Sequence, residues 1–196
     1  MEKKYEVEYR ALINIETFKK LLKKGKKEYS ESFHGPLIIQ DAYFCPQSVK
    51  KFKEVEMEEV GSYSLRLRRE IKSEKENVTL NTKIIKQKGD HNAWLEHEVI
   101  ISSYKECEKI LKAMGFKIFF EFKKTRYSFK ENEIHVCLED IDNFQPIIEI
   151  EILTSKSKTE LAKKKLLEYF SKNNIEQKTI VKKSVTNMLM RKNSSF

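Results

Sequence analysis

The sequence has little cysteine, glycine or proline, and it has no long apolar run. Its three cysteines, Cys45, Cys107 and Cys137, are far apart and form no Cys-x-x-Cys pair, which argues against a disulfide framework or a thiolate metal site. The five glycines and three prolines favour regular elements joined by modest loops over a disordered chain. No segment reaches the roughly 20 apolar residues that a membrane span requires, and the first residues lack the apolar core of a signal peptide. We therefore expect a soluble, cytoplasmic protein with no membrane partner.

The length, composition and charge suit one folded domain. At 196 residues, 39% hydrophobic and 35% charged, the chain is long enough to bury a core, and we expect one domain over residues 1–196 with C-terminal helices at about 157–191. The formal charge of +9 is compatible with a phosphorylated partner, although a lysine-rich surface explains it equally well. The four histidines have no metal-ligand spacing, and we assign His97 and His135 structural or surface roles.

Short apolar runs predict a chain dominated by β-strands. We expect a break or bend in the strand predicted at Phe116–Phe129, a turn at Lys88–Asn92, and a flexible loop at Ser48–Glu59. The predicted strands are Tyr5–Ile13, Leu37–Phe44, Tyr63–Glu70, Asn77–Gln87, Trp94–Ile101, Phe116–Phe129, Glu133–Leu138 and Pro146–Leu153.

Capping residues predict where the helices begin. Asn14 is an N-cap for a helix that Gly25 and the lysines around it end, and Ser103 opens a capping box whose helix closes at Gly115. Ser157 and Glu160 have the same capping form before another apolar stripe, and a final helix is predicted over Lys182–Met190.

Charged residues recur at every second position within these strands. Residues i and i+2 of a strand point to the same face, so each pair lies opposite the apolar residues that alternate with it. The groups that share a face are Glu6, Glu8 and Arg10; Arg66 and Arg68; Asn81 and Lys83; Glu96 and Glu98; Lys124 and Arg126; and Glu149 and Glu151. Any one pair is also typical of a solvated strand face, but the recurrence favours a common charged surface.

A shared charged surface indicates a specific kind of ligand. If the sheet curls into a closed barrel with helices packed outside, the charged faces line a wet tunnel, because isolated buried charge is too costly to leave unpaired. Arginine forks and lysines bind phosphate oxygens, and so many cations suit a chain of three phosphates. The glutamates supply hard oxygen ligands, which Mg²⁺ and Mn²⁺ prefer.

The motifs occur in an order that resembles the CYTH superfamily, the triphosphate tunnel metalloenzymes. Glu6 to Arg10 is similar to the family's Glu-x-Glu-x-Lys signature, with arginine in place of lysine. Asp41 to Phe44, Arg66 to Arg68, Lys83, Glu96 to Glu98, Lys124 to Arg126 and Leu138 to Glu151 follow in the family's order, over roughly residues 4 to 190. Two departures are Glu139, where aspartate is common, and Gln145-Pro146, where a glycine usually precedes the last strand.

The resemblance implies an α+β fold, a closed antiparallel eight-stranded β-barrel with helices outside, and residue roles within it. The metal ligands it implies are Glu6, Glu8, Glu149 and Glu151, with Glu139 as a further candidate. The phosphate binders it implies are Arg10, Arg66, Arg68, Lys83, Lys124 and Arg126. Glu8 and Arg10 become the catalytic candidates, and we expect Arg10 to act electrostatically because guanidinium does not deprotonate in proteins.

The function that this resemblance implies is Mg²⁺- or Mn²⁺-dependent hydrolysis of a triphosphate-containing small molecule, whether inorganic triphosphate, thiamine triphosphate or a nucleoside triphosphate. One alternative is an adenylate cyclase of the class IV type, which makes cyclic AMP and pyrophosphate from ATP. Another is a non-catalytic module that binds polyphosphate or RNA, which the +9 charge favours. We do not expect nucleic acid to be the partner, and the family likeness favours a monomer or a homodimer.

Overall fold

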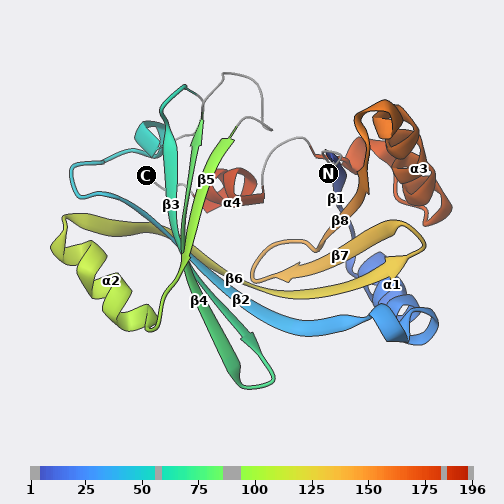
Figure 1. Cartoon of the computed structure of the whole chain (residues 1–196), viewed down its shortest axis with the longest axis horizontal. Helices are drawn as coiled ribbons and strands as arrows, with labels where there is room; N and C mark the ends of the chain where they lie inside the picture. The colour runs from blue at the N-terminus through green and yellow to red at the C-terminus, as the bar shows by residue number, and fades with distance from the viewer. Residues whose placement is uncertain (1–4, 56–58, 86–93, 182–184, 194–196) are drawn as a thin grey trace. The chain divides into compact units, whose positions relative to one another are not determined.

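The computed structural model describes residues 5–55, 59–85, 94–181 and 185–193 (Figure 1). Its strands are β1 (Tyr5–Leu12), β2 (His34–Pro46), β3 (Tyr63–Lys72), β4 (Lys75–Ile85), β5 (Trp94–Ile100), β6 (Phe116–Glu131), β7 (Ile134–Ile141) and β8 (Ile147–Thr154). Its helices are α1 (Ile15–Glu28), α2 (Tyr104–Ala113), α3 (Thr159–Lys172) and α4 (Val185–Asn193).

The strands form one eight-stranded antiparallel sheet in the order β1-β8-β7-β6-β2-β3-β4-β5, which confirms the α+β class. This order ends at β1 and β5, and hydrogen bonds close no ring among the described residues, so the predicted closed barrel is not confirmed. The chain divides into two compact units. The first unit is Met1–Leu37 with Lys124–Ser184, and the second unit is Ile38–Lys123 with Val185–Phe196.

The core of the first unit lies between its strands and two helices. Val7 of β1, Ile150 of β8 and Leu138 of β7 are buried on one face of the strands, together with Phe18 of α1 and Phe170 of α3. Since side chains alternate along a strand, the opposite face carries the charged residues at the intervening positions. The helices therefore cover the apolar face, as the alternation predicts.

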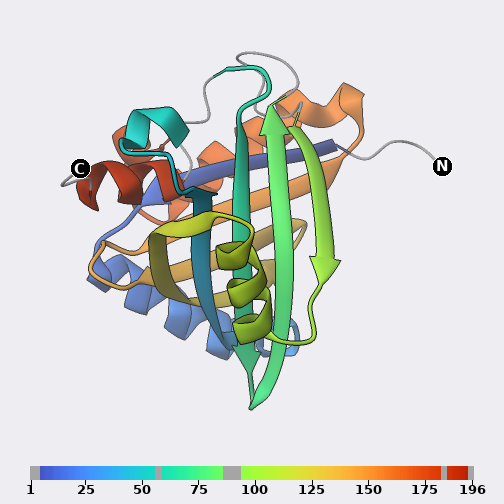
Figure 2. The same ribbon diagram turned by 90° about the vertical axis from the view of Figure 1, so that its left-hand side faces the viewer.

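The second unit buries a separate core. Leu67 of β3 and Val78 of β4 pack with Ala42 of β2, and Cys107 and Leu111 of α2 complete this cluster. Figure 2 shows α2 in front of β3, and its buried residues pack with those of β3 and β4. On β5 the prediction of a covered apolar face was wrong for the described residues, since Leu95 is 37% exposed and Val99 is 54% exposed.

The N-caps of the first two helices follow the sequence. Asn14 Oδ1 accepts a hydrogen bond from the Thr17 amide at 2.8 Å, and Ser103 Oγ accepts one from the Glu106 amide at 3.4 Å. The predicted end at Gly25 was wrong, because α1 continues to Glu28. Gly25 lies instead where the helix meets Phe129, since a Cβ atom there would be 2.6 Å from Cδ1 of that ring.

Other element ends also differ from the prediction. Helix α3 begins at Thr159 after a short 3-10 turn, Lys156–Lys158, so Ser157 is not its cap. Strand β6 runs from Phe116 to Glu131 with no break. A 3-10 turn at Phe52–Val55 lies within the predicted loop. The turn predicted at residues 88–92 and the predicted start of the last helix lie outside the described residues.

Candidate metal and phosphate site

The register of the first unit places the charged residues in rows across neighbouring strands. Glu8 of β1 is opposite Glu151 of β8, which is opposite His135 of β7. Two residues along, Arg10 is opposite Glu149 in the next row. Directly opposite residues share a face of the sheet, so the alternation within each strand and the register between strands bring these side chains together.

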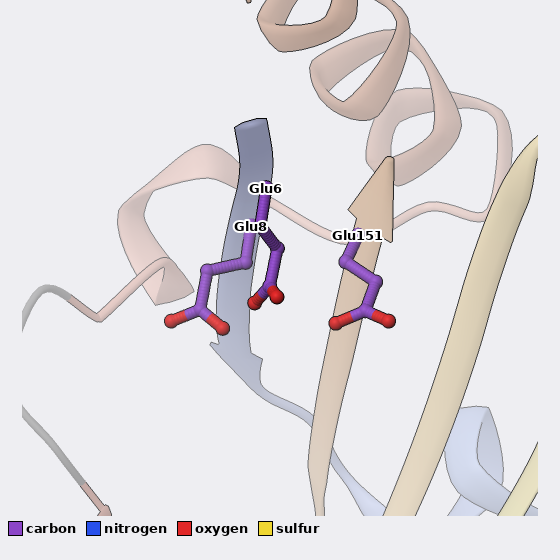
Figure 3. Close-up of side chains that lie close together, drawn as sticks. All are labelled: Glu6, Glu8 and Glu151. Carbon is purple, nitrogen blue, oxygen red and sulfur yellow. The ribbon is translucent and has the colours of Figure 1, made fainter. Parts of the chain in front are cut away.

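Glu6, Glu8 and Glu151 form a carboxylate cluster, which we call the acid cluster. Each of the three offers a carboxylate oxygen, and these oxygens lie within 4.8 Å of one another. Figure 3 shows the three side chains leaving β1 and β8 toward a common region. Carboxylate oxygens are the ligands that Mg²⁺ and Mn²⁺ prefer, so the donor set fits the ions that the sequence predicts.

Burial and mutual repulsion both make ionisation of this cluster costly. Burial raises the pKa of Glu8, and the nearby carboxylates of Glu149, Glu6 and Glu151 raise it further, while Arg10 acts in the opposite direction. Like charges that converge disfavour the ionised state, and a divalent cation relieves that repulsion. The sequence signal for the cluster was the pair of Glu-x-Glu spacings near the two ends of the chain.

Glu149, a predicted metal ligand, accepts a hydrogen bond from Arg10. Arg10 Nε donates to Glu149 Oε2 at 2.6 Å, and Nη2 of the same guanidinium donates to Glu8 Oε1 at 3.2 Å. Burial lowers the pKa of Arg10, but Glu149 and Glu8 outweigh it and the net pKa is raised. Arg10 therefore stays charged and joins the acid cluster to the neighbouring row. A metal-binding role for Glu149 stays a prediction.

Glu139 lies between two of the predicted phosphate binders. Its Oε1 accepts from Lys124 Nζ at 2.7 Å and from Arg126 Nε at 2.9 Å, and the side chain is almost fully buried. Burial raises the pKa of Glu139, but the attraction of Lys124 and Arg126 outweighs it and lowers that pKa to about 2. The carboxylate therefore holds both cations in place, and its role as a metal ligand stays a prediction.

In the second unit, a buried carboxylate orders one of the predicted arginines. Asp41 of β2 is 2% exposed and accepts two hydrogen bonds from Arg68, from Nε and from Nη2, both at 2.7 Å. A bidentate pair of this kind fixes the plane of the guanidinium. Burial lowers the pKa of Arg68, but the bonds to Asp41 outweigh it and the net pKa is raised, so this arginine stays charged.

Two buried polar atoms beside this pair have no hydrogen-bond partner among the described residues. They are Arg66 Nε and Thr79 Oγ1. Arg66 is opposite Asn81 in the register and Arg68 is opposite Thr79, so all four side chains share one face of β3 and β4. Both orphan atoms can donate a hydrogen bond, and buried donors without partners are rare in native proteins. An anionic oxygen on this face would satisfy them.

Lys83 and Asn81, also on this face, converge on Glu96 of β5. Asn81 Nδ2 donates to Glu96 Oε1 at 2.5 Å, and Lys83 Nζ lies 3.2 Å from Glu96 Oε2. Burial raises the pKa of Glu96, but the Asn81 and Lys83 contacts outweigh it and lower the net value. Lys83 is thus positioned by a carboxylate, as Arg68 and Lys124 are.

Sequence reasoning missed two residues of these networks. Asp41 was named only as part of a strand motif. It lies opposite Arg68 through the register of β2 and β3, for which the sequence holds no signal. His135 was assigned a structural or surface role, yet it contacts Glu151. The available signal was its spacing, because His135, Cys137 and Glu139 lie at i, i+2 and i+4 on the charged face of β7.

None of the described helices combines the length and the apolar composition that a membrane span requires. No curated protein matches the chain. Solved structures do match it over nearly their whole length. The PH1819 protein of Pyrococcus horikoshii OT3 is 24% identical with a TM-score of 0.70, and the match covers 96% of this chain and 99% of that one.

Two further solved structures are candidate adenylate cyclases. The one from Vibrio parahaemolyticus is 18% identical with a TM-score of 0.66, over 94% of this chain and 97% of its own. The one from Bacillus halodurans is 17% identical with a TM-score of 0.61, over 100% of both chains. At these identities the likeness concerns the fold. The model of the CYTH domain matches residues 4–185, almost the whole sequence, and the chain therefore belongs to the CYTH domain family.

Proposed function

We propose that this chain binds a triphosphate-containing small molecule together with Mg²⁺ or Mn²⁺ and hydrolyses it. The observation that carries the proposal is the acid cluster of Glu6, Glu8 and Glu151, whose carboxylate oxygens lie within 4.8 Å of one another. In the first unit, the same face of the strands also bears Lys124 and Arg126. CYTH-domain proteins are typically enzymes that act on triphosphates, which agrees with this chemistry.

The acid cluster would hold the metal ion, with Glu8 and Glu151 as neighbours across β1 and β8 and Glu6 beside them. When bound, a divalent ion offsets charge on phosphate oxygens and lowers the pKa of coordinated water. The protein's own contribution is to supply ionised carboxylates at fixed positions. The register of β1 and β8 sets the positions of Glu8 and Glu151.

The cations would bind and orient the phosphates. In the first unit Lys124 and Arg126 are fixed by Glu139, and in the second unit Arg68 is fixed by Asp41. Arg66 Nε is buried, lies 4.0 Å from Asp41 Oδ1 and makes no hydrogen bond among the described residues, so a phosphate oxygen would suit it. Donors that are already held in place need little reorganisation when charge develops on the substrate, and such electrostatic preorganisation is usually the largest catalytic term.

Arg10 would act through its charge. It holds Glu149 and Glu8, and its raised pKa excludes proton transfer at neutral pH. In this proposal Arg10 both restrains Glu8 and offsets negative charge beside the acid cluster. A lysine at this position could do the second task, but it could not donate from a rigid fork to two carboxylates at once.

The test is phosphate release from tripolyphosphate, thiamine triphosphate and ATP, each with Mg²⁺ or Mn²⁺, for the wild type and for Glu8→Gln and Glu151→Gln. We expect metal-dependent release from at least one substrate, with a loss of at least about 100-fold in each variant. Glu133→Gln, at an exposed glutamate that pairs with Lys165, serves as the matched control and should keep full activity. Full activity in excess chelator, or in the two cluster variants, would contradict the proposal.

A second candidate is cyclisation of ATP to cyclic AMP and pyrophosphate. It is favoured by the two structurally similar candidate adenylate cyclases. The same carboxylates and cations would hold the triphosphate while the ribose 3′-hydroxyl attacks the α-phosphorus and pyrophosphate leaves. Chromatography of the products from ATP separates the two reactions, because hydrolysis gives phosphate and cyclisation gives cyclic AMP with pyrophosphate.

A further inference from the structure

His135 touches the acid cluster from the neighbouring strand. Its Nδ1 atom lies 2.9 Å from Glu151 Oε1, and the two residues are directly opposite in the register of β7 and β8. An ionised carboxylate can only accept a hydrogen bond, so Nδ1 carries the proton and donates it. This contact fixes both the tautomer of the imidazole and the rotation of the Glu151 carboxylate.

We propose that His135 is a positioning residue for the metal ion, because it orients the Glu151 carboxylate within the acid cluster. This inference rests on the proposed function, since it concerns the metal site that the function requires. One N–H donor uses one of the roughly four lone pairs of a carboxylate, and the others stay available to a cation. Partners of this kind, one step removed from the metal, typically change metal affinity by about 10–100-fold.

The two carboxylates of β8 have different partners, and this difference supports the assignment. Glu149 is bound at 2.6 Å by the guanidinium of Arg10, whose full positive charge opposes a nearby divalent cation, whereas Glu8 of the acid cluster accepts from that guanidinium at 3.2 Å. Glu151 is bound by an imidazole, which can donate the same hydrogen bond while neutral. Glu151 is therefore ordered without being neutralised, and it is the β8 carboxylate that belongs to the acid cluster.

The other neighbour of His135 Nδ1 does not compete with Glu151 for its N–H group. Cys137 Sγ, the other neighbour of Nδ1, is 4.0 Å away and is a weak acceptor. Burial raises the pKa of Cys137 to about 12, so the sulfur is a neutral thiol at neutral pH. A thiol cannot compete with a carboxylate for the N–H group, and Glu151 remains its acceptor.

The test is direct Mn²⁺ binding by the protein without substrate, measured from the electron paramagnetic resonance signal of free Mn²⁺. The variants are His135→Ala, which removes the donor, and His135→Asn, whose amide nitrogen is as many bonds from the backbone as Nδ1. His135→Gln moves the amide to the position of Nε2 and is the matched control for size and polarity. Far-ultraviolet circular dichroism and thermal unfolding check that each variant is folded.

We expect the dissociation constant for Mn²⁺ to rise about 10-fold in His135→Ala and in His135→Gln, and to stay within about 3-fold of wild type in His135→Asn. Unchanged affinity in His135→Ala, or equal losses in all three variants, would overturn the assignment. Mn²⁺ binding by Glu151→Gln distinguishes failure of the positioning role of His135 from failure of the metal site that the proposed function requires. If the wild type itself binds no Mn²⁺, or Glu151→Gln binds as well as wild type, the metal site is refuted and the positioning role with it.

Discussion

Replacing Glu139 by glutamine removes the anion that holds Lys124 and Arg126. Glu139 is 4% exposed and accepts from Lys124 Nζ at 2.7 Å and from Arg126 Nη2 at 2.5 Å. A pKa of about 2 in place of 4.5 corresponds to about 3 kcal/mol of folding free energy at neutral pH. We expect Glu139→Gln to lower the free energy of unfolding by about this amount at pH 7.

The direction of the pKa shift of Glu139 determines how this contribution to stability changes with pH. The folded-state pKa is depressed, so the contribution is complete above the ordinary pKa of 4.5 and is lost as the pH falls through about 2. The difference in the free energy of unfolding between wild type and Glu139→Gln should therefore fall at pH 3 to about half of its value at pH 7. The measurements use metal-free protein at constant ionic strength, so that metal binding and salt screening do not contribute to the stability difference.

Equilibrium urea unfolding, followed by far-ultraviolet circular dichroism between pH 3 and pH 7, measures this difference. Hydrogen exchange of the β6 and β7 amides locates it within the first unit. Glu133→Gln is the control, because Glu133 pairs with Lys165 at the surface, where such pairs contribute about 0–1 kcal/mol. Equal stability of the two variants at pH 7, or a difference that does not change with pH, would refute the reasoning.

Three further predictions concern other contacts in the structure. Asp41→Asn removes one of the two acceptors for Arg68, so we expect a loss of about 2 kcal/mol in urea unfolding and weaker tripolyphosphate binding in calorimetry; unchanged values for both would contradict the role of Asp41. Gly25→Ala places a Cβ atom 2.6 Å from the Phe129 ring, so thermal unfolding should show a loss of about 1–3 kcal/mol, whereas a gain would mean that the higher helix propensity of alanine decides. All three cysteines are buried, and burial raises the pKa of Cys137 to about 12. A thiol reagent at pH 8 should therefore label the native protein far more slowly than the unfolded protein, whereas equal labelling rates would show that the thiols are accessible.

The strands and their charged faces could be predicted from the sequence because both depend on the two-residue period of a strand. Glu6 and Glu8 share a face with Arg10 for that reason alone, and Val7 between them is buried in the core. The caps at Asn14 and Ser103 were equally local, since each side chain bonds an amide three residues away. Local spacing therefore predicted these two caps, although the same spacing at Ser157 does not cap α3.

The partners of the charged groups could not be predicted, because they depend on the register between strands. Nothing within β8 distinguishes Glu149, which binds Arg10, from Glu151, which joins the acid cluster. The same holds for Glu139, whose partners lie on β6, and for His135, whose partner lies on β8. The close approach of Gly25 to Phe129 is likewise a tertiary contact that the local sequence does not give.

The central claim is that the acid cluster is where a divalent metal ion binds. An anomalous difference map from crystals grown with Mn²⁺ and tripolyphosphate tests it most directly. We expect a Mn²⁺ peak within coordination distance of oxygens from at least two of Glu6, Glu8 and Glu151. A Mn²⁺ peak elsewhere, with the acid cluster empty, would contradict the claim.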